Sequence, residues 1–321
     1  MSEARHRTYL LTGTLLTGVL LAFFLTVLSS GAKAQAQVVA TGDPVLAAAG
    51  DIAQCTSQND EATAALLGTV PGATVVAALG DNAYESGTTA EYQNCYGPSW
   101  GLYKVQTMPS LGNHEYKTAG ASGYFDYFSG LSATPSAPVP NTAENPGLTP
   151  GKGYYSYDLG SWHIVVLNSN CANVGGCTRT SPQVQWLKAD LAAHPTACTL
   201  AYWHAPRFSS RQTSTPFGAF WNALYASRAE VVLNGHRHNY ERFAEQTPGG
   251  VAAPGQGIRE FVVGTGGGNL QSFTTIRANS EVHDASTFGV LKLTLHPSSY
   301  DWQFVPVAGQ SFTDSGTTSC H

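Results

Sequence analysis

The sequence predicts an α/β sandwich that forms one domain over residues 40–321, behind an N-terminal targeting segment. Two observations support this fold class. Beyond the N-terminal segment, short apolar runs of strand length alternate with amphipathic helical patterns, and the last part of the chain is rich in strand-like sequence. The chain has 321 residues and 42% hydrophobic content, which is sufficient to bury the core of such a domain. No internal repeat or second domain boundary is apparent.

The expected strands are short, apolar and bounded by turn residues. They cover residues 45–50, 74–79, 162–167, 199–203, 231–234, 261–264, 290–295 and 302–305. The last two strands flank a His-Pro-Ser-Ser segment at residues 296–299, where we expect the chain to turn.

Two helices carry clear start signals. Residues 59–67 begin with a capping residue and early acids. Ser181 and Pro182 provide an N-cap and a first-turn proline for a second helix. A further helical stretch is expected near residues 217–225, whereas residues 134–152 are rich in Pro, Ala, Asn and Gly and predict a long surface loop.

The first residues have the pattern of an export signal. A basic start containing Arg5 and Arg7 precedes a largely apolar run over residues 9–28, and two small-x-small patterns follow. We therefore predict a signal peptide over residues 1–34, or 1–36, and a secreted protein. The alternative is an uncleaved membrane anchor, because the apolar run is longer than a typical signal core.

Six cysteines follow the targeting segment, and an even count in an exported protein predicts disulfides. They lack the spacing of a zinc finger. The sequence does not decide the pairing, but we favour Cys171 with Cys177, because the glycines between them let the chain turn back. The net charge of −5 and the lack of a basic stripe disfavour a dedicated nucleic-acid surface.

Five segments place polar side chains directly after an apolar strand, where α/β sheets bind their ligands. Any one of them is ordinary turn or packing chemistry, but together they predict a shared cleft. Oxygen and imidazole donors without thiolates suit zinc, iron or manganese, and a bridging carboxylate would hold two such ions about 3.5–4 Å apart. The residues are Asp51, Asp81, Tyr84, Asn113, His114, His204, His236 and His238.

In this order, the segments GD, GDxxY, GNHE, H and GHxH resemble the motifs of the calcineurin-like metallophosphoesterases. The sequence is most similar to the purple acid phosphatase branch. Ala53 stands where many relatives have a metal-binding histidine, and Tyr84 stands where that branch supplies a tyrosinate. The resemblance implies a four-layer α/β/β/α sandwich. The chain looks like a compact, bacterial-type secreted member, without the extra β domain of plant-type members.

The resemblance also implies two metal ions, iron paired with zinc, manganese or a second iron. Their ligands would be Asp51, Tyr84 and His238 for the first ion, Asn113, His204 and His236 for the second, and Asp81 as the bridge.

His114 would face the substrate instead of binding metal and would act as the general acid. The branch usually has extra phosphate-gripping histidines between the fourth and fifth segments, and none lies between His204 and His236 here. Arg207 and Arg211 have suitable chemistry to replace them, because guanidinium binds phosphate oxygens well. The alternative is that both are surface arginines.

The activity implied by the resemblance is hydrolysis of small phosphate monoesters, as in acid or alkaline phosphatases, by a hydroxide held between two metal ions. A phosphodiesterase on the same scaffold and a non-catalytic module that binds metal and phosphate are the alternatives. The glycine-rich run at residues 264–268 has no following helix or Lys-Ser/Thr pair, so we expect a flexible turn near the site and not a phosphate-binding loop.

Overall fold

The computed structural model describes residues 42–321, except 130–131, 135–136, 139–146, 197 and 212–215. The predicted signal peptide lies outside the described residues and stays a prediction. The described residues belong to one compact unit. Among them, no helix is both long enough and apolar enough to cross a membrane.

A first sheet of six strands has the order β17-β16-β15-β1-β3-β5. β1, β3 and β5 are parallel, and β15, β16 and β17 extend the sheet in antiparallel fashion. All five residues of β1 are buried, as expected for a central strand. The strands are β1 (Val45–Ala49), β3 (Ala73–Ala78), β5 (Thr107–Pro109), β15 (Gly289–His296), β16 (Ser299–Pro306) and β17 (Ser315–Ser319).

A second sheet of seven strands has the order β14-β12-β13-β11-β10-β9-β8. Its centre is parallel, because β9, β10, β11 and β13 run in one direction. β8 and β12 flank this centre in antiparallel fashion, and β14 pairs antiparallel with β12. The strands are β8 (Tyr155–Leu159), β9 (Trp162–Val166), β10 (Cys198–Tyr202), β11 (Val231–Asn234), β12 (Tyr240–Phe243), β13 (Arg259–Val263) and β14 (Ser280–Asp284).

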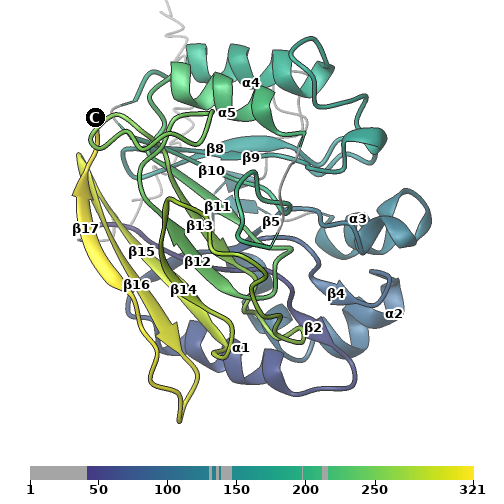
Figure 1. Cartoon of the computed structure of the whole chain (residues 1–321). Helices are drawn as coiled ribbons and strands as arrows, with labels where there is room; N and C mark the ends of the chain where they lie inside the picture. The colour runs from purple at the N-terminus through teal and green to yellow at the C-terminus, as the bar shows by residue number, and fades with distance from the viewer. Residues whose placement is uncertain (1–41, 130–131, 135–136, 139–146, 197, 212–215) are drawn as a thin grey trace, which may run out of the picture. The chain divides into compact units, whose positions relative to one another are not determined.

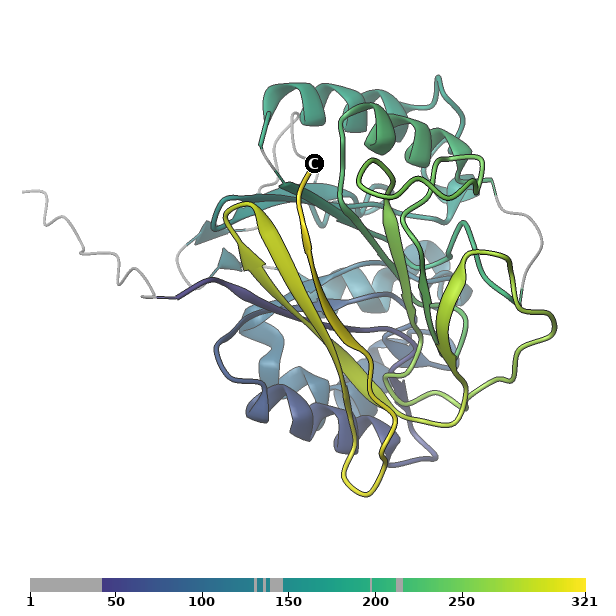
Figure 2. The ribbon, with the colours of Figure 1, turned by 60° about the vertical axis from the view of Figure 1, so that its left-hand side comes forward.

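Helices cover the outer faces of the two sheets (Figures 1 and 2). α1 (Asn59–Thr69) lies against the first sheet, whereas α4 (Pro182–Ala193) and α5 (Gly218–Ala226) cover the second. Side chains along β9 alternate accordingly: Ile164 packs in the core that contains both sheets, and Val165 packs with α4 and α5. The α/β fold expected from the sequence is confirmed, and the arrangement agrees with layers in the order α/β/β/α.

Short elements connect the strands. They include the paired strands β2 (Ala53–Gln54) and β4 (Ala83–Tyr84), the pair β6 (Ser132–Thr134) and β7 (Ala137–Pro138), the α-helices α2 (Thr89–Glu91) and α3 (Ser122–Phe128), and the helical turns η1 (Tyr92–Tyr96), η2 (Trp100–Gln106), η3 (Glu115–Lys117), η4 (Ala119–Ala121) and η5 (Cys171–Asn173). β6 and β7 fall at and within the predicted loop 134–152, part of which lies outside the described residues.

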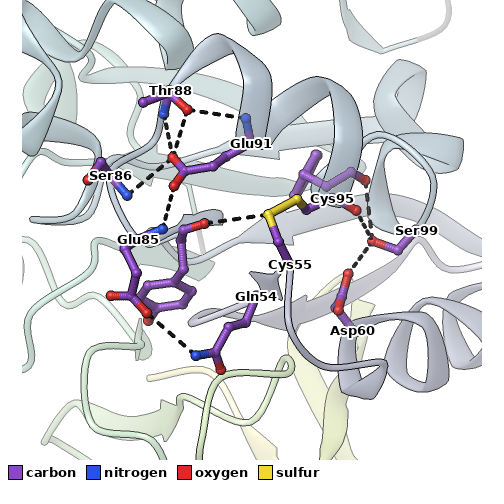
Figure 3. The surroundings of a disulfide bond; sticks show 11 residues. Gln54, Cys55, Asp60, Glu85, Ser86, Thr88, Glu91, Cys95 and Ser99 are labelled. Carbon is purple, nitrogen blue, oxygen red and sulfur yellow. Dashed lines mark hydrogen bonds between the residues drawn. A yellow bond between two sulfur atoms is a disulfide. The ribbon is translucent and has the colours of Figure 1, made fainter.

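Three disulfides join the six cysteines. They are Cys55–Cys95, Cys171–Cys177 and Cys198–Cys320, so the favoured short pairing is confirmed. Cys55–Cys95 links the chain after β2 to η1, beside the loop that follows β4 (Figure 3). Cys198–Cys320 fixes the end of the chain to the start of β10.

Candidate metal centre

The predicted site residues lie where five parallel strands end. β1, β3 and β5 of the first sheet and β10 and β11 of the second are each followed, within a few residues, by at least one of them. The two sheets therefore direct their carboxyl ends toward one place, as ligand sites in α/β folds require. The residues brought together by hydrogen bonds and ring contacts are Asp51, Asp81, Tyr84, His114, His204, His236 and His238.

Three side chains form the half of the site that the sequence assigned to the first ion. The hydroxyl of Tyr84 lies 2.9 Å from Asp51 Oδ1 and 3.1 Å from His238 Nε2. His238 Nε2 lies 3.2 Å from the same oxygen of Asp51. Asp51 is fully buried and the His238 side chain is 15% exposed, so two oxygens and one nitrogen meet at the edge of the core.

Asp81 connects this group to the other half of the site. Its Oδ2 atom lies 3.4 Å from the Tyr84 hydroxyl and 3.1 Å from His204 Nε2. His236 Nδ1 in turn lies 3.2 Å from His204 Nε2. One carboxylate oxygen thus faces both groups of donors, which is the position needed for a bridging ligand.

Backbone carbonyls fix the orientation of two of the histidine rings. His204 Nδ1 donates to the carbonyl oxygen of Leu79 at 2.9 Å, and His238 Nδ1 donates to that of Asn269 at 2.9 Å. Nδ1 of each ring therefore carries a proton, and Nε2 of each ring faces a carboxylate. Metal-binding histidines are normally held in this way, so the donor set fits metal ions.

The backbone at the site is strained. Asp51, Asp81 and His236 have φ angles of 59°, 49° and 68°, a region that costs non-glycine residues free energy. Neighbouring glycines make the close approach possible. A Cβ atom on Gly112 would lie 2.1 Å from Asp81 Oδ1, and one on Gly235 would lie 2.9 Å from Asp51 Oδ2.

The charges are coupled across the site. Burial opposes ionisation of Asp51 and Asp81, but the nearby histidines outweigh it and lower the pKa of both carboxyls. Burial likewise opposes the charged form of His204, yet Asp81 raises its pKa to about 9. Burial and His204 lower the pKa of His236 to about 3. Metal binding must therefore displace a proton from His204 and none from His236.

Burial, followed by the charge of Asp51, raises the pKa of Tyr84 well above its ordinary value. Its phenol is thus protonated beside the two aspartates, and it needs a cation to become a tyrosinate ligand.

His114 lies at the accessible edge of this group. Its backbone N–H donates to Asp81 Oδ1 at 2.7 Å, and its ring packs edge-on against Tyr84 with 4.6 Å between centroids. Its Nδ1 lies 2.7 Å from the carbonyl oxygen of Glu85. The side chain of His114 is 20% exposed, so it can reach a bound molecule. Asn113, the residue before it, is exposed.

The two predicted phosphate-binding arginines make other contacts. Arg207 donates through Nε and Nη2 to the carbonyl oxygen of Pro248, at 3.0 and 2.7 Å. Arg211 donates to the carbonyl oxygen of Ser272 at 2.6 Å. Arg211 nevertheless lies near Arg237, whose pKa is lowered by burial and then by Arg211. Arg237 follows His236 directly, so the structure adds this cation to the candidates.

Sequence reasoning missed two supports of the site. The glycine-rich turn is buried and not a flexible rim, since Gly266 N–H donates to Gly50 O and Gly268 N–H donates to Asp51 O at 2.9 and 2.7 Å. Glu115, which belongs to the GNHE motif, is fully buried and accepts a hydrogen bond from the N–H of Asp81. Burial and the charge of Asp81 raise the pKa of Glu115 to about 7, against the backbone N–H groups that lower it.

Curated proteins with similar sequences are purple acid phosphatases of Arabidopsis thaliana. Purple acid phosphatase 15 is 28% identical over 51% of this chain and 35% of its own length. Purple acid phosphatase 23 is 30% identical over 48% of this chain and 34% of its own length. The chain thus spans about a third of the length of these relatives.

Solved structures show the same fold at lower identity. Purple acid phosphatase PPD1 of yellow lupin (Lupinus luteus) matches with a TM-score of 0.63 and 17% identity, over 86% of this chain and 53% of the lupin chain. GAP50, the anchor in the inner membrane complex of Plasmodium, matches with a TM-score of 0.64 and 12% identity, over 87% of this chain and 90% of its own.

The family model for calcineurin-like phosphoesterases matches residues 37–240, a span that contains every predicted site residue. The strand-end site, its donor set and this match agree. The chain belongs to the calcineurin-like phosphoesterase family.

Proposed function

We propose that this protein is a metal-dependent phosphoesterase that hydrolyses small phosphate monoesters. The observation that carries the proposal is the convergence of buried oxygen and nitrogen donors at the ends of strands from both sheets. Asp51, Tyr84 and His238 would hold one ion, His204, His236 and Asn113 the other, and Asp81 would be shared. When bound, the two ions would supply positive charge for the phosphate oxygens and activate water for attack.

His114 is the proposed general acid. Its ring stands beside Asp81, with 3.9 Å between His114 Nε2 and Asp81 Oδ2, and remains open to solvent. An alkoxide leaving group needs a proton as it departs, and an imidazole held at the edge of the site can deliver one. Nδ1 lies 2.7 Å from Glu85 O, and Lys117 Nζ lies 3.4 Å from Nε2, the nitrogen that we expect to face the substrate.

Monoester preference is tested by turnover on a matched panel of alkyl phosphate monoesters and diesters, using protein of measured metal content. We expect activity on monoesters that a chelator abolishes and added metal restores. Faster turnover of diesters would favour the phosphodiesterase alternative. Phosphate binding without turnover of any ester would favour a non-catalytic module.

Iron is the proposed first ion, with Tyr84 as one of its ligands. This assignment can be tested directly, because a tyrosinate bound to ferric iron absorbs visible light. Protein loaded with ferric iron should show a visible band, and Tyr84→Phe should abolish it while the far-ultraviolet circular dichroism stays unchanged. A band of equal intensity in the variant would remove Tyr84 from the ligand set.

Export is also part of the proposal, and the three disulfides support it, since such bonds persist in oxidising compartments. Fractionation and N-terminal sequencing test it. A mature chain starting at residue 35 or 37 outside the cytoplasm is expected, and an intact start in the membrane fraction would instead support anchoring.

A further inference from the structure

Glu115 accepts four hydrogen bonds, and two of them come from the loop that carries Asp81. Oε2 accepts from the N–H groups of Asp81 and Gly112 at 3.1 and 2.6 Å. Oε1 accepts from the N–H of Asn82 and from the hydroxyl of Tyr92 at 2.7 and 3.1 Å. Every partner is a donor, so both oxygens of a buried carboxylate are satisfied by ordered groups.

The two amides that Glu115 binds in the Asp81 loop lie on either side of the Asp81 Cα atom. Fixing the N–H of residues 81 and 82 fixes the φ and ψ angles between them. Asp81 needs such support, because its φ of 49° lies in the left-handed region. Asp51 has a similar φ of 59° but is held by the backbone, through its own N–H to Gly80 O and the N–H of Ile52 to Asp81 O.

Glu115 also joins the Asp81 loop to the Gly112 loop, and this connection orients the Asp81 carboxylate. With the loops held together, the N–H of His114 donates to Asp81 Oδ1 at 2.7 Å. Oδ1 is therefore engaged by the backbone, and Oδ2 is left to face Tyr84 and His204.

We propose that Glu115 is a positioning residue, which holds the carboxylate of Asp81 in the conformation that binds both metal ions. This role rests on the proposed metal centre. Because the carboxylate acts on the metal-binding geometry, its loss should weaken metal binding beyond any general loss of stability. Partners of metal ligands typically change metal affinity about 10- to 100-fold when they are mutated.

Glu91 provides a matched control in the same region. Its carboxylate also accepts four hydrogen bonds, from the N–H groups of Glu85, Ser86 and Thr88 and from the Thr88 hydroxyl (Figure 3). These groups follow Tyr84 in the chain and do not flank Asp81. Glu91→Gln therefore removes a comparable set of contacts without freeing the bridging ligand.

The experiment measures Zn²⁺ affinity of chelator-stripped protein at about pH 8, by competition with a chromogenic chelator, together with the melting temperature of each metal-free variant. Glu115→Gln should bind Zn²⁺ about 10- to 100-fold more weakly than wild type. Glu91→Gln should stay within about threefold. Tyr92→Phe, which removes one donor from Glu115, should weaken binding about fivefold, the effect of one hydrogen bond.

Equal losses of affinity in Glu115→Gln and Glu91→Gln would overturn the positioning role, as would wild-type affinity in Glu115→Gln. If Glu115→Gln does not fold, Tyr92→Phe decides, and unchanged Zn²⁺ affinity there overturns the role. Wild-type protein that binds no Zn²⁺ would overturn the metal centre itself, whereas normal wild-type binding with unaffected variants would overturn only the role of Glu115.

Discussion

Two groups of histidine and aspartate side chains in the described part of the chain lie close enough together to hold a metal ion, and they differ in construction. The first belongs to the candidate metal centre, at the strand ends. The second, which we call the helix-side cluster, lies between β9 and the end of α4. The groups are Asp81, His204 and His236 in the centre, and His163, Asp190 and His194 in the helix-side cluster.

The ring nitrogens are used differently in the two groups. In His204, one ring nitrogen donates to a backbone carbonyl and the other faces Asp81. In His163, both ring nitrogens contact carboxylates: Nδ1 lies 2.9 Å from Asp158 Oδ1, and Nε2 lies 2.9 Å from Asp190 Oδ2. His194 stacks on His163 at 4.5 Å with 11° between the ring planes, so the two rings do not converge on a common point. The helix-side cluster is thus a closed network of ion pairs.

The backbone conformation also differs between the two groups. Asp81 and His236 hold positive φ angles, whereas His163 lies in a regular strand and Asp190 in a regular helix. Strain of this kind persists only where surrounding contacts impose it, and it collects at functional sites. Proximity of metal-binding residue types is therefore a weaker sign of function than a strained backbone combined with ring nitrogens that are directed at one shared carboxylate.

Turnover should separate the two groups most strongly. Asp81→Ala should lower turnover of a phosphate monoester by about 10⁴-fold or more, since metal ions contribute several kcal/mol to such reactions. His194→Ala should leave turnover within about twofold of wild type. Steady-state kinetics on both variants tests this contrast. A large loss in His194→Ala would mean that the helix-side cluster serves the reaction.

A smaller effect is expected for His114, which lies in the centre without being a proposed ligand. His114→Ala should keep its metal and lose about 10²- to 10⁴-fold in turnover of an alkyl phosphate. The loss should shrink for a nitrophenyl phosphate, whose leaving group needs little protonation. Metal content and both rates should be measured together. Equal losses for both esters, or loss of metal, would contradict the general-acid role.

The smallest effect is expected in the helix-side cluster, on stability. Burial opposes the charged form of His163, but hydrogen bonds to Asp190 and Asp158 outweigh it and raise its pKa above the ordinary value of 6.5. Protonated His163 therefore stabilises the fold. This contribution is fully present below pH 6.5 and is lost as pH rises through the folded-state pKa of His163. His163→Gln should therefore lower the free energy of unfolding by about 1–3 kcal/mol in acid and by less in alkali.

Urea unfolding of wild type and His163→Gln at about pH 6 and about pH 9 measures this difference. A gap between the two proteins that widens with rising pH would contradict a protonated His163. Metal content should be the same in both.

Local sequence signals predicted the apolar strands well, and the turns that follow them bring the candidate ligands together. Several strands were missed, and two of them show why. Tyr240–Phe243 contains two charged residues that are buried by partners distant in sequence, since Glu241 accepts from Ser210 and Arg242 pairs with Asp314. Ser280–Asp284 is polar and partly exposed, so it lacks the apolar pattern of a strand.

The sequence also indicated which side chains the structure brings together at the strand ends, but not what supports them. Glu115 stands in a recognisable motif, yet its hydrogen bonds to Asp81, Gly112 and Tyr92 depend on how three separate loops meet. Arg207 has the right chemistry for phosphate, but its guanidinium binds Pro248 O, a contact that no local pattern encodes. Residue type can be inferred from a motif, whereas its partners are set by the tertiary fold.

Metal analysis of purified protein tests the central claim most directly, with His204→Ala and His194→Ala beside wild type. We predict about two ions per chain in wild type and in His194→Ala. We predict fewer ions in His204→Ala, because that variant loses a proposed ligand of the metal centre. Unchanged metal content in His204→Ala, or a loss of metal in His194→Ala, would contradict the assignment of the metal centre to the strand ends.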